Sequence, residues 1–137
     1  MDEDAIKQYL ADTFPDLQSQ SSPDGASFFF VGGERKFPFA TLVTSDAHDN
    51  ASQLDRPGIF RLNIGVSRET FRTLFDSSED GTYDFAALDT FLPHPVYGSM
   101  FWISALNPGE ATWEKTRSLL AEAHDLAASR QEKRTDA

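Results

Sequence analysis

The sequence predicts an α+β fold, an antiparallel sheet of about four or five strands with the N- and C-terminal helices packed on one face. A length of 137 residues, with 39% hydrophobic and 25% charged residues, is typical of one folded domain. Apolar residues recur at helical spacing near both ends, whereas the middle holds short alternating or continuously apolar segments typical of strands. We therefore expect a single domain over residues 1–137, with about 130–137 as a disordered or frayed tail.

The N-terminal segment has the pattern of an amphipathic helix. Over residues 4–14 one face is apolar, and Pro15 ends the pattern. The apolar residues of that face are Ala5, Ile6, Tyr9, Leu10 and Phe14. The polar residues 18–25 contain a Pro-Asp-Gly turn signal and predict a loop.

Two apolar segments, residues 27–31 and 36–45, predict a β-hairpin with a turn at residues 32–35. The GGERK sequence at this turn contains glycines, but a phosphate-binding loop opens onto the N-terminus of a helix, whereas this turn joins two strands. A hairpin turn is therefore favoured over a phosphate site. Pro38 lacks the N–H that a strand ladder needs, so we expect it at an edge or a bulge.

A predicted strand over residues 59–64 follows a polar loop over residues 46–55. Its side chains alternate, and its apolar face consists of Phe60, Leu62 and Ile64. Arg61 and Asn63 belong to the opposite face, so we expect Arg61 on the side of the sheet away from the core, or in a pocket. A short helix over residues 68–75, capped by the preceding serine, follows this strand.

The C-terminal half predicts a loop, then one or two helical turns over residues 84–91, and a strand over residues 100–106. The Asn-Pro-Gly-Glu sequence that begins at Asn107 combines an N-cap residue, a proline in the first turn and a glutamate three residues on. This combination predicts the start of the last helix. Trp102 lies on the predicted strand and Trp113 on the helix, and we expect both to pack into the core.

Composition and charge exclude several classes of function. Because the chain has no cysteine, disulfides, thiolate zinc sites and cysteine catalysis are excluded. A net charge of −10 disfavours attraction to nucleic acid and anionic membranes, although residues 35–72 hold a local excess of basic side chains. The N-terminus lacks a signal-peptide pattern, and no apolar run approaches the ~20 residues of a membrane span. We therefore expect a cytoplasmic protein with no membrane or nucleic-acid partner.

Residues 91–102, FLPHPVYGSMFW, carry the most specific local signal. Pro95 pushes His94 out of the α-helical region, and the preceding proline is itself fixed in φ, so the imidazole is held on a stiff extended loop. With an ordinary pKa of about 6.5, a histidine in this position could act as a general acid or base. The alternative is a hydrogen-bonded anchor of the loop with no catalytic role.

A metal site and a base-stacking surface are weaker alternatives. Asp46, His48 and Asp49 offer oxygen and nitrogen donors within one loop, but their spacing matches no defined site. We therefore expect no bound metal and no cofactor. Aromatic residues would stack bases if they were exposed on a basic sheet, whereas twelve phenylalanines in so short a chain favour a core between a sheet and two helices.

Three segments of the sequence resemble known families. FVGGERKFPFATLVT, DRPGIFRLNIGVS and HPVYGSMFWISALNPGE resemble a bacterial family of functionally uncharacterised proteins, over about Phe30 to Ala127. The order of elements, with the last strand and helix, is also distantly similar to the MmcQ/YjbR-like proteins, which are small bacterial α+β domains. Neither resemblance supplies established catalytic residues. The second one implies a DNA-binding role by fold analogy alone.

The sequence thus favours a non-enzymatic binding or interaction module. Its site is expected on the sheet face away from the helices, where it would bind a small anionic ligand or a protein partner, with Arg61 as a bidentate donor. The residues expected to converge there are His94, Tyr97, Arg61 and Asn63. An enzyme of unknown reaction that uses His94 as general acid or base is the alternative, and a weak nucleic-acid binder is the third. The identity of the ligand and the oligomeric state stay open.

Overall fold

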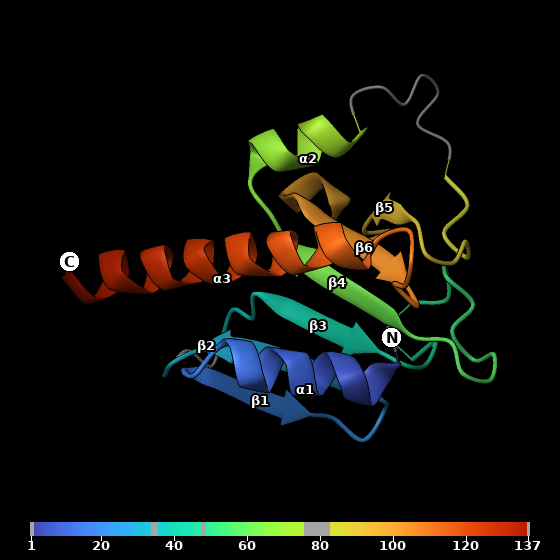
Figure 1. Cartoon of the computed structure of the whole chain (residues 1–137), viewed down its shortest axis with the longest axis horizontal. Helices are drawn as coiled ribbons and strands as arrows, with labels where there is room; N and C mark the ends of the chain where they lie inside the picture. The colour runs from blue at the N-terminus through green and yellow to red at the C-terminus, as the bar shows by residue number, and fades with distance from the viewer. Residues whose placement is uncertain (1, 34–35, 48, 76–82, 137) are drawn as a thin grey trace.

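The computed structural model describes residues 2–33, 36–47, 49–75 and 83–136, and in these it has six strands, three α-helices and one 3₁₀ turn (Figure 1). The helices are α1 (Glu3–Thr13), α2 (Arg68–Phe75) and α3 (Trp113–Asp136), and the 3₁₀ turn is η1 (Gly98–Met100). The strands are β1 (Leu17–Ser21), β2 (Ala26–Val31), β3 (Ala40–Val43), β4 (Arg61–Gly65), β5 (Phe91–Pro93) and β6 (Trp102–Leu106).

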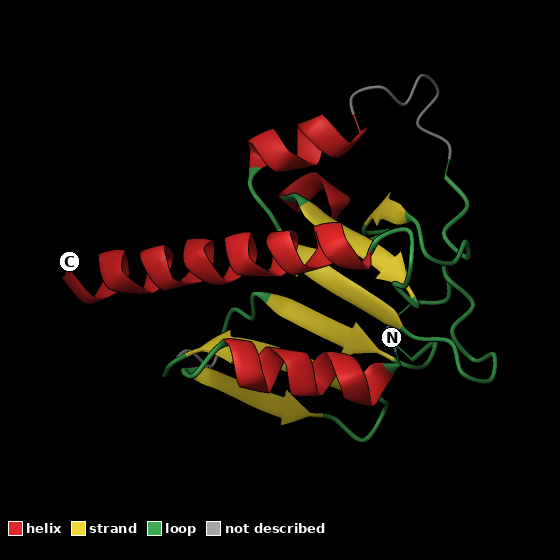
Figure 2. Ribbon diagram, in the orientation of Figure 1, coloured by secondary structure: helices red, strands yellow, loops and turns green. Residues whose placement is uncertain are grey.

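The strands form one sheet in the order β1-β2-β3-β4-β6-β5, and each neighbouring pair is antiparallel. The predicted α+β class and antiparallel sheet are confirmed, with six strands in the described residues instead of four or five. β4 and β6 lie side by side although α2 and β5 separate them in sequence (Figure 2). Residues from distant parts of the chain therefore meet on the sheet.

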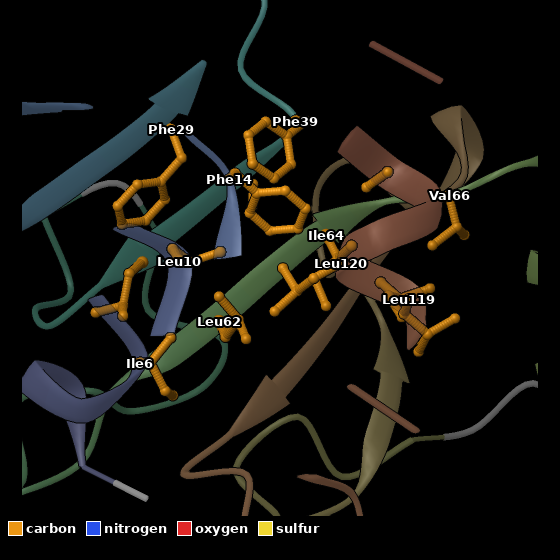
Figure 3. Packing of buried hydrophobic residues seen from close by; sticks show 14 of the residues in the cluster. Ile6, Leu10, Phe14, Phe29, Phe39, Leu62, Ile64, Val66, Leu119 and Leu120 are labelled. Carbon is orange, nitrogen blue, oxygen red and sulfur yellow. The ribbon is translucent and has the colours of Figure 1, made fainter. Parts of the chain in front are cut away.

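α1 and α3 cover one face of the sheet, as the sequence predicts (Figure 3). Their apolar stripes contribute Ile6, Leu10, Leu119 and Leu120, each at most 2% exposed. The sheet residues packed in the same cluster include Phe29, Leu42, Leu62, Ile64 and Ile103. Burial of this apolar surface, at roughly 25 cal/mol per Å², is the main contribution that holds the two layers together.

The opposite face of the sheet carries a smaller apolar cluster at one end, made by Val43, Leu54, Leu92 and Leu106. β4 alternates as predicted, because Leu62 and Ile64 pack under the helices whereas Arg61 and Asn63 form polar contacts on the other side. Side chains from β3, β4, β6 and the loop after β5 therefore share this second face.

β1 corrects one prediction, since the sequence favours a loop over residues 18–25. The strand is polar and mostly exposed, so no hydrophobic pattern marks it. It forms because its backbone pairs with β2 along its whole length. The connection between the two strands places Gly25 at φ +90°, in the left-handed region that favours glycine.

The predicted hairpin is present as β2 and β3, but its second strand is shorter than predicted. β3 starts at Ala40, and Pro38 lies before it. The proline therefore lies just before an interior strand of the sheet and not within an edge strand. Because proline has no backbone N–H to donate, β3 does not extend its pairing with β2 back to Pro38. Residues 34–35 of the expected turn lie outside the described residues.

Residues 84–91 form turns and an isolated bridge where the sequence predicts one or two turns of helix. The backbone of Leu88 pairs with Leu106 of β6, and the chain then continues into β5. Pairing with β6 supplies partners for these backbone groups, whereas an isolated helix of two turns is costly to nucleate. The tertiary contact therefore overrides the local helical pattern.

α3 begins later in the chain than the predicted N-cap, Asn107, implies. The Asn107 side chain instead accepts the N–H of Phe60 and donates to the carbonyl of Gly58, both at 2.9 Å. Asp89 supplies the cap from another segment. Its carboxylate accepts three N–H groups that precede α3, those of Gly109, Ala111 and Thr112. A carboxylate there also complements the positive end of the helix dipole.

The two tryptophans lie in different environments. Trp113 packs against the core under the helices and meets Tyr9 edge to face, with ring centroids 5.1 Å apart. The prediction that Trp102 packs into the same core is wrong. Alternation along β6 places Ile103 in that core, so Trp102, which lies opposite Gly65 in the register, faces the other side of the sheet.

α3 continues to Asp136, into residues 130–137 for which the sequence predicts a frayed tail. Its C-terminal turns project beyond the sheet (Figure 1). In the part of the chain that the structure describes, no helix is both long and apolar enough to cross a membrane.

Candidate ligand-binding site

A cavity of about 490 Å³ lies over the second face of the sheet. Its polar lining consists chiefly of Thr41, Asp49, Arg61, Asn63 and His94. Its apolar and aromatic lining includes Phe28, Phe37, Val96, Tyr97, Met100 and Trp102. We call this space the open-face cavity. The structure brings to it all the residues singled out from the sequence as a candidate site, which are Arg61, Asn63, His94 and Tyr97.

Arg61 is only 1% exposed, and Asp49 neutralises its charge. The carboxylate of Asp49 accepts hydrogen bonds from Nη1 at 3.0 Å and from Nη2 at 2.7 Å, and Ser52 Oγ accepts a further bond from Nη1 at 3.0 Å. The hydrogen bonds and charge of Arg61 hold the pKa of Asp49 below its ordinary value, although burial opposes them. The guanidinium fork that was expected to hold an anion is thus occupied by a side chain of the same protein.

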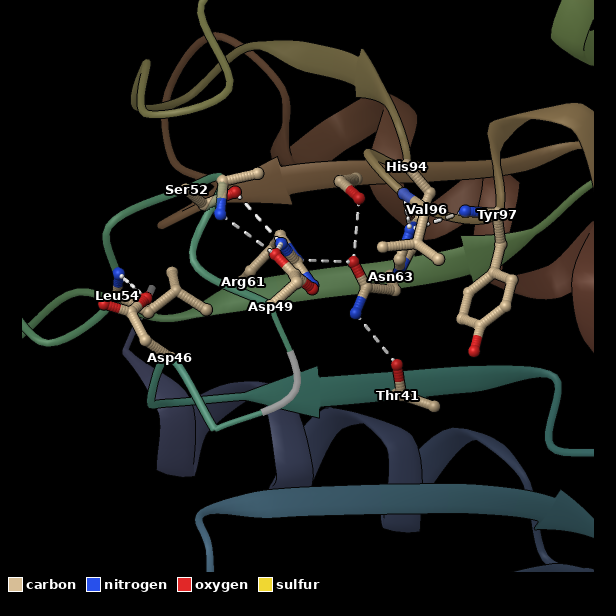
Figure 4. Close-up of polar contacts among 12 residues, drawn as sticks. Thr41, Asp46, Asp49, Ser52, Leu54, Arg61, Asn63, His94, Val96 and Tyr97 are labelled. Carbon is tan, nitrogen blue, oxygen red and sulfur yellow. Dashed lines mark hydrogen bonds and ion pairs between the residues drawn. The ribbon is translucent and has the colours of Figure 1, made fainter.

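Asn63 connects this ion pair to the neighbouring strands (Figure 4). Its Oδ1 accepts from Arg61 Nε at 3.0 Å and from Ser104 Oγ at 2.7 Å, and its Nδ2 donates to Thr41 Oγ1 at 2.9 Å. Within the described residues, no fully buried side-chain nitrogen or oxygen lacks a hydrogen-bond partner. The network therefore fixes the polar side of the cavity in one arrangement.

His94 anchors the loop after β5 through Nδ1, which accepts the backbone N–H groups of Val96 and Tyr97, both at 3.0 Å (Figure 4). The backbone N–H of His94 donates to the carbonyl of Trp102 at 2.9 Å and so extends the pairing with β6. Burial, and secondarily the charge of Arg61, lower the pKa of His94 to about 4. The ring is therefore neutral near pH 7, and because Nδ1 accepts, its proton is on Nε2.

The mouth of the open-face cavity is surrounded by exposed apolar side chains. Four of its apolar lining residues are more than half exposed, namely Phe37, Val96, Tyr97 and Met100. The ring of Tyr97 also lies near the imidazole of His94, with centroids 5.0 Å apart. Exposed apolar side chains gathered around a concave site are typical of a ligand-binding groove.

A second cavity of about 590 Å³ adjoins the first and shares four lining residues with it, namely Phe37, Pro38, Met100 and Trp102. α3 and the end of β4 supply most of the rest of its lining. Apart from Arg130 and the Trp102 indole, its lining side chains are apolar. Because specificity needs placed polar groups, the open-face cavity is the better candidate for a site.

The aspartates considered from the sequence as metal donors have other partners. Asp46 Oδ1 accepts the N–H of Leu54 at 2.8 Å, and Asp49 binds Arg61. His48 lies outside the described residues. Over the residues that are described, no group of three or more His, Cys, Asp or Glu side chains is placed to hold a metal ion.

The residues that sequence reasoning did not assign to the site are the partners of Arg61 and Asn63. They are Thr41, Asp49, Ser52 and Ser104. A buried arginine on a strand signals that an acidic partner is near, but the loop before β4 contains three aspartates. The sequence pattern does not distinguish among them.

Comparison with known proteins identifies one family and one protein of similar fold. A family model described as a family of unknown function, DUF6194, matches residues 1–136. The fold is similar to that of a protein from Pseudomonas syringae whose crystal structure is known. The TM-score is 0.63 at 16% sequence identity, and the likeness covers 93% of this chain and 99% of that chain. At this identity the likeness shows the fold alone. No curated protein matches the sequence.

Proposed function

The chain belongs to the DUF6194 family of unknown function, and we propose that it acts as a non-enzymatic module that binds a small organic molecule in the open-face cavity. One observation carries this proposal. The cavity combines a buried polar network, centred on Arg61 and Asn63, with an aromatic and apolar lining. Small-molecule sites typically have this composition, in which the apolar lining contributes affinity and a few fixed polar groups set orientation.

The size of the cavity supports a small ligand. Its volume of about 490 Å³ falls within the range of roughly 300–1,000 Å³ that is usual for small-molecule pockets. Trp102, Tyr97 and Phe28 line it and offer flat apolar surfaces. Such surfaces bury the faces of a planar ligand efficiently, because aromatic rings have a large area and little conformational entropy to lose.

The hydrogen bonds of His94 favour binding over acid–base catalysis. A general base needs a free lone pair on the nitrogen that meets the substrate, but the Nδ1 lone pair accepts two backbone N–H groups and Nε2 carries the proton. A neutral imidazole is a very weak acid, and the lowered pKa of His94 disfavours the imidazolium that would serve as a general acid. The role that remains for this side chain is that of a hydrogen-bond donor.

Nucleic acid and protein partners are less well supported. The net charge of −10 opposes binding to nucleic acid, whose affinity comes largely from cations that neutralise phosphates. A stable protein interface normally buries about 800 Å² on each partner. A small concave site is better matched to a small molecule than to a surface of that area. The distant resemblance to the MmcQ/YjbR-like proteins contributes a fold analogy and no binding residue. We also propose that the protein is cytoplasmic.

A thermal-shift screen against small aromatic and heteroaromatic metabolites tests this function. A ligand that binds only the native state stabilises it by about 2.7 kcal/mol when present at 100 times its Kd, which raises Tm by several degrees. Each hit is then repeated on Val96→Phe, in which a larger side chain narrows the mouth of the cavity. Val96 is 52% exposed, so the substitution should leave the fold intact.

Leu88→Phe is the matched control, because Leu88 is also an exposed apolar residue, at 46%, and does not line the open-face cavity. We expect the ligand-induced rise in Tm to be lost in Val96→Phe and kept in Leu88→Phe. The proposal is contradicted if no compound stabilises the wild-type protein, or if every hit stabilises both variants equally.

A further inference from the structure

We propose that the ligand of the open-face cavity is an uncharged planar molecule that presents a carbonyl oxygen or a ring nitrogen to the Nε2–H of His94. This inference rests on the proposed function and names the chemical class of the ligand. It differs from the expectation drawn from the sequence, which was a small anion held by Arg61. Two independent observations carry it, one concerning His94 and the other concerning the charges around the cavity.

The first observation is a hydrogen-bond donor of His94 that has no protein partner. The side chain lines the cavity and is only 7% exposed, and both bonds to its ring are accepted by Nδ1. Within the described part of the chain, Nε2 has no hydrogen-bond partner, and no fully buried side-chain nitrogen or oxygen is left unsatisfied. Nε2 therefore retains contact with open space. His94 lines the cavity together with Arg61 and Asp49, whose charges both act on its ring.

A donor in this position selects an acceptor. The neutral imidazole offers one N–H at Nε2 and no second lone pair, so it hydrogen-bonds a carbonyl oxygen or a pyridine-type nitrogen. The loop cannot easily turn the ring over to offer a lone pair instead, because the bonds from Val96 and Tyr97 hold Nδ1 as the acceptor. A buried N–H that the ligand leaves unpaired costs about 1–3 kcal/mol, which gives the site selectivity.

The second observation is that the buried charges cancel. Arg61 and Asp49 form a bidentate pair, so the strongest cation near the cavity offers little net attraction to an anion. Displacing Asp49 would transfer its carboxylate to solvent and break the bonds to Nη1 and Nη2. An anionic ligand would have to replace these interactions before it gained any new ones. A neutral ligand requires no such exchange.

The remaining basic side chain of the lining is Lys36, and it is placed at the exposed rim. Its Nζ lies 5.3 Å from the centroid of the Phe37 ring, so it already makes a cation–π contact. Exposed charges attract weakly at physiological salt. The net charge of −10 adds a long-range repulsion of anions. Electrostatics thus favour an uncharged ligand over an anion of the same shape.

Three naphthalene compounds with one ring system separate these ligand classes. 2-Naphthamide is neutral and carries an acceptor, 2-naphthoate is its anionic counterpart, and naphthalene has no acceptor. Isothermal titration calorimetry at pH 7 measures their affinities for the wild-type protein. We expect 2-naphthamide to bind roughly tenfold more tightly than 2-naphthoate, and also more tightly than naphthalene.

His94→Asn then tests the hydrogen bond without removing the loop anchor. Asn Oδ1 takes the position of Nδ1 and can accept the same N–H groups of Val96 and Tyr97, whereas the donor at the position of Nε2 is lost. Loss of one hydrogen bond to a neutral acceptor should weaken 2-naphthamide roughly three- to tenfold. The affinity of naphthalene should not change. Lys115→Gln is the control, because Lys115 is an exposed lysine of α3 that lines neither cavity, and it should leave the affinity of 2-naphthamide unchanged.

The outcomes separate this inference from the proposed function. The inference is overturned if 2-naphthoate binds as tightly as 2-naphthamide, if His94→Asn leaves the affinity of 2-naphthamide unchanged, or if none of the three compounds binds. In each case the broader screen with Val96→Phe decides separately whether the cavity is a binding site. If these compounds bind Val96→Phe as tightly as they bind the wild-type protein, they do not bind in the open-face cavity. The inference is then overturned, and these compounds no longer support the cavity as a binding site.

Discussion

The carboxylate of Asp49 accepts hydrogen bonds from both terminal nitrogens of Arg61, at 3.0 Å from Nη1 and 2.7 Å from Nη2. It thereby neutralises the charge of an arginine that is only 1% exposed. The two residues come from a loop and from β4, twelve positions apart in the chain. Their contact holds the loop against the second face of the sheet. It also decides the electrostatic character of the open-face cavity, because it leaves the floor nearly neutral.

Asp49→Ala should therefore lower the free energy of unfolding by about 3–5 kcal/mol, because it leaves a buried guanidinium without its counter-ion. Urea unfolding at pH 7 measures this loss. Asp55→Ala is the control in the same loop, since Asp55 is exposed and accepts the N–H of Asp46, and it should cost less than about 1 kcal/mol. Equal losses in the two variants would contradict a stabilising role for the ion pair.

The cost of Asp49→Ala should depend on Arg61. In an Arg61→Met background there is no buried charge to leave unpaired, so adding Asp49→Ala should cost clearly less than it does in the wild-type protein. A double-mutant cycle by urea unfolding gives this coupling energy. Strict additivity of the two substitutions would show that the pair contributes nothing specific.

The features that local pattern controls were predictable from the sequence. Alternation along residues 59–64 placed Leu62 and Ile64 under the helices and Arg61 on the other face, since a strand has a strict period of two. The helical spacing of the N-terminal segment likewise placed Ile6 in the core. The same alternation put Arg61 and Asn63 on one strand face, whereas their meeting with His94 and Tyr97 depends on the pairing of β4 and β5 with β6.

The features that depend on contacts between distant segments were not predictable. β1 has no hydrophobic pattern and exists because it pairs with β2. Asp49 and Asp89 each bind groups that the local sequence does not indicate, since Asp89 caps α3 from a segment about twenty residues upstream. Asn107 fits the sequence rule for an N-cap, yet its side chain binds Phe60 and Gly58. Tertiary hydrogen bonds prevailed over local ones in these cases.

Asp89→Ala should destabilise the protein by about 1–2 kcal/mol, because it removes the acceptor of three backbone N–H groups and of Thr112 Oγ1. Thermal unfolding at pH 7 measures this. Asp84→Ala is the matched control, since Asp84 is exposed and its carboxylate accepts the N–H of Ala86 within the same segment. A loss no larger than that of the control would show that Asp89 does not cap α3.

The effect of Asp89 should also depend on pH. Burial raises the pKa of Asp89, but the hydrogen bonds from Thr112, Ala111 and Gly109 outweigh it and hold the pKa below the ordinary 3.8. A carboxylate with a lowered native pKa stabilises fully above the unfolded-state value and loses this contribution as the pH falls through the native one. The gap in stability between wild type and Asp89→Ala should therefore shrink below about pH 4. An unchanged gap at acid pH would contradict the charged cap.

Trp102→Ala should cost less stability than Trp113→Ala. Trp102 borders two cavities, so its removal exposes little of the core, whereas Trp113 packs under the helices against Tyr9. We expect about 1–2 kcal/mol for Trp102→Ala, below the 3–5 kcal/mol typical of an aromatic side chain deleted from a core. Urea unfolding of both variants makes the comparison. A larger loss for Trp102→Ala would mean that its indole supports the fold more than it shapes the cavity.

Duplex DNA should bind only weakly at physiological salt. Affinity for DNA requires cations that displace counter-ions from phosphates, and this chain has 12 Lys and Arg residues against 22 Asp and Glu. Fluorescence anisotropy with a labelled 20-base-pair duplex should give no submicromolar binding at about 150 mM salt. A tight complex whose affinity falls steeply with salt would contradict this and favour a nucleic-acid function.

The burial of His94 as a neutral ring should make the protein less stable in mild acid. Its native pKa is lowered to about 4, whereas in the unfolded chain it is 6.5, so between these values the unfolded state binds more protons than the native state. Stability is then complete above pH 6.5 and falls as the pH approaches 4. The expected loss between pH 7 and pH 5 is about 2 kcal/mol. His94→Asn has no titrating group there and should lose less over the same interval. Urea unfolding at the two pH values measures both changes, and equal losses would show that His94 is not the group responsible.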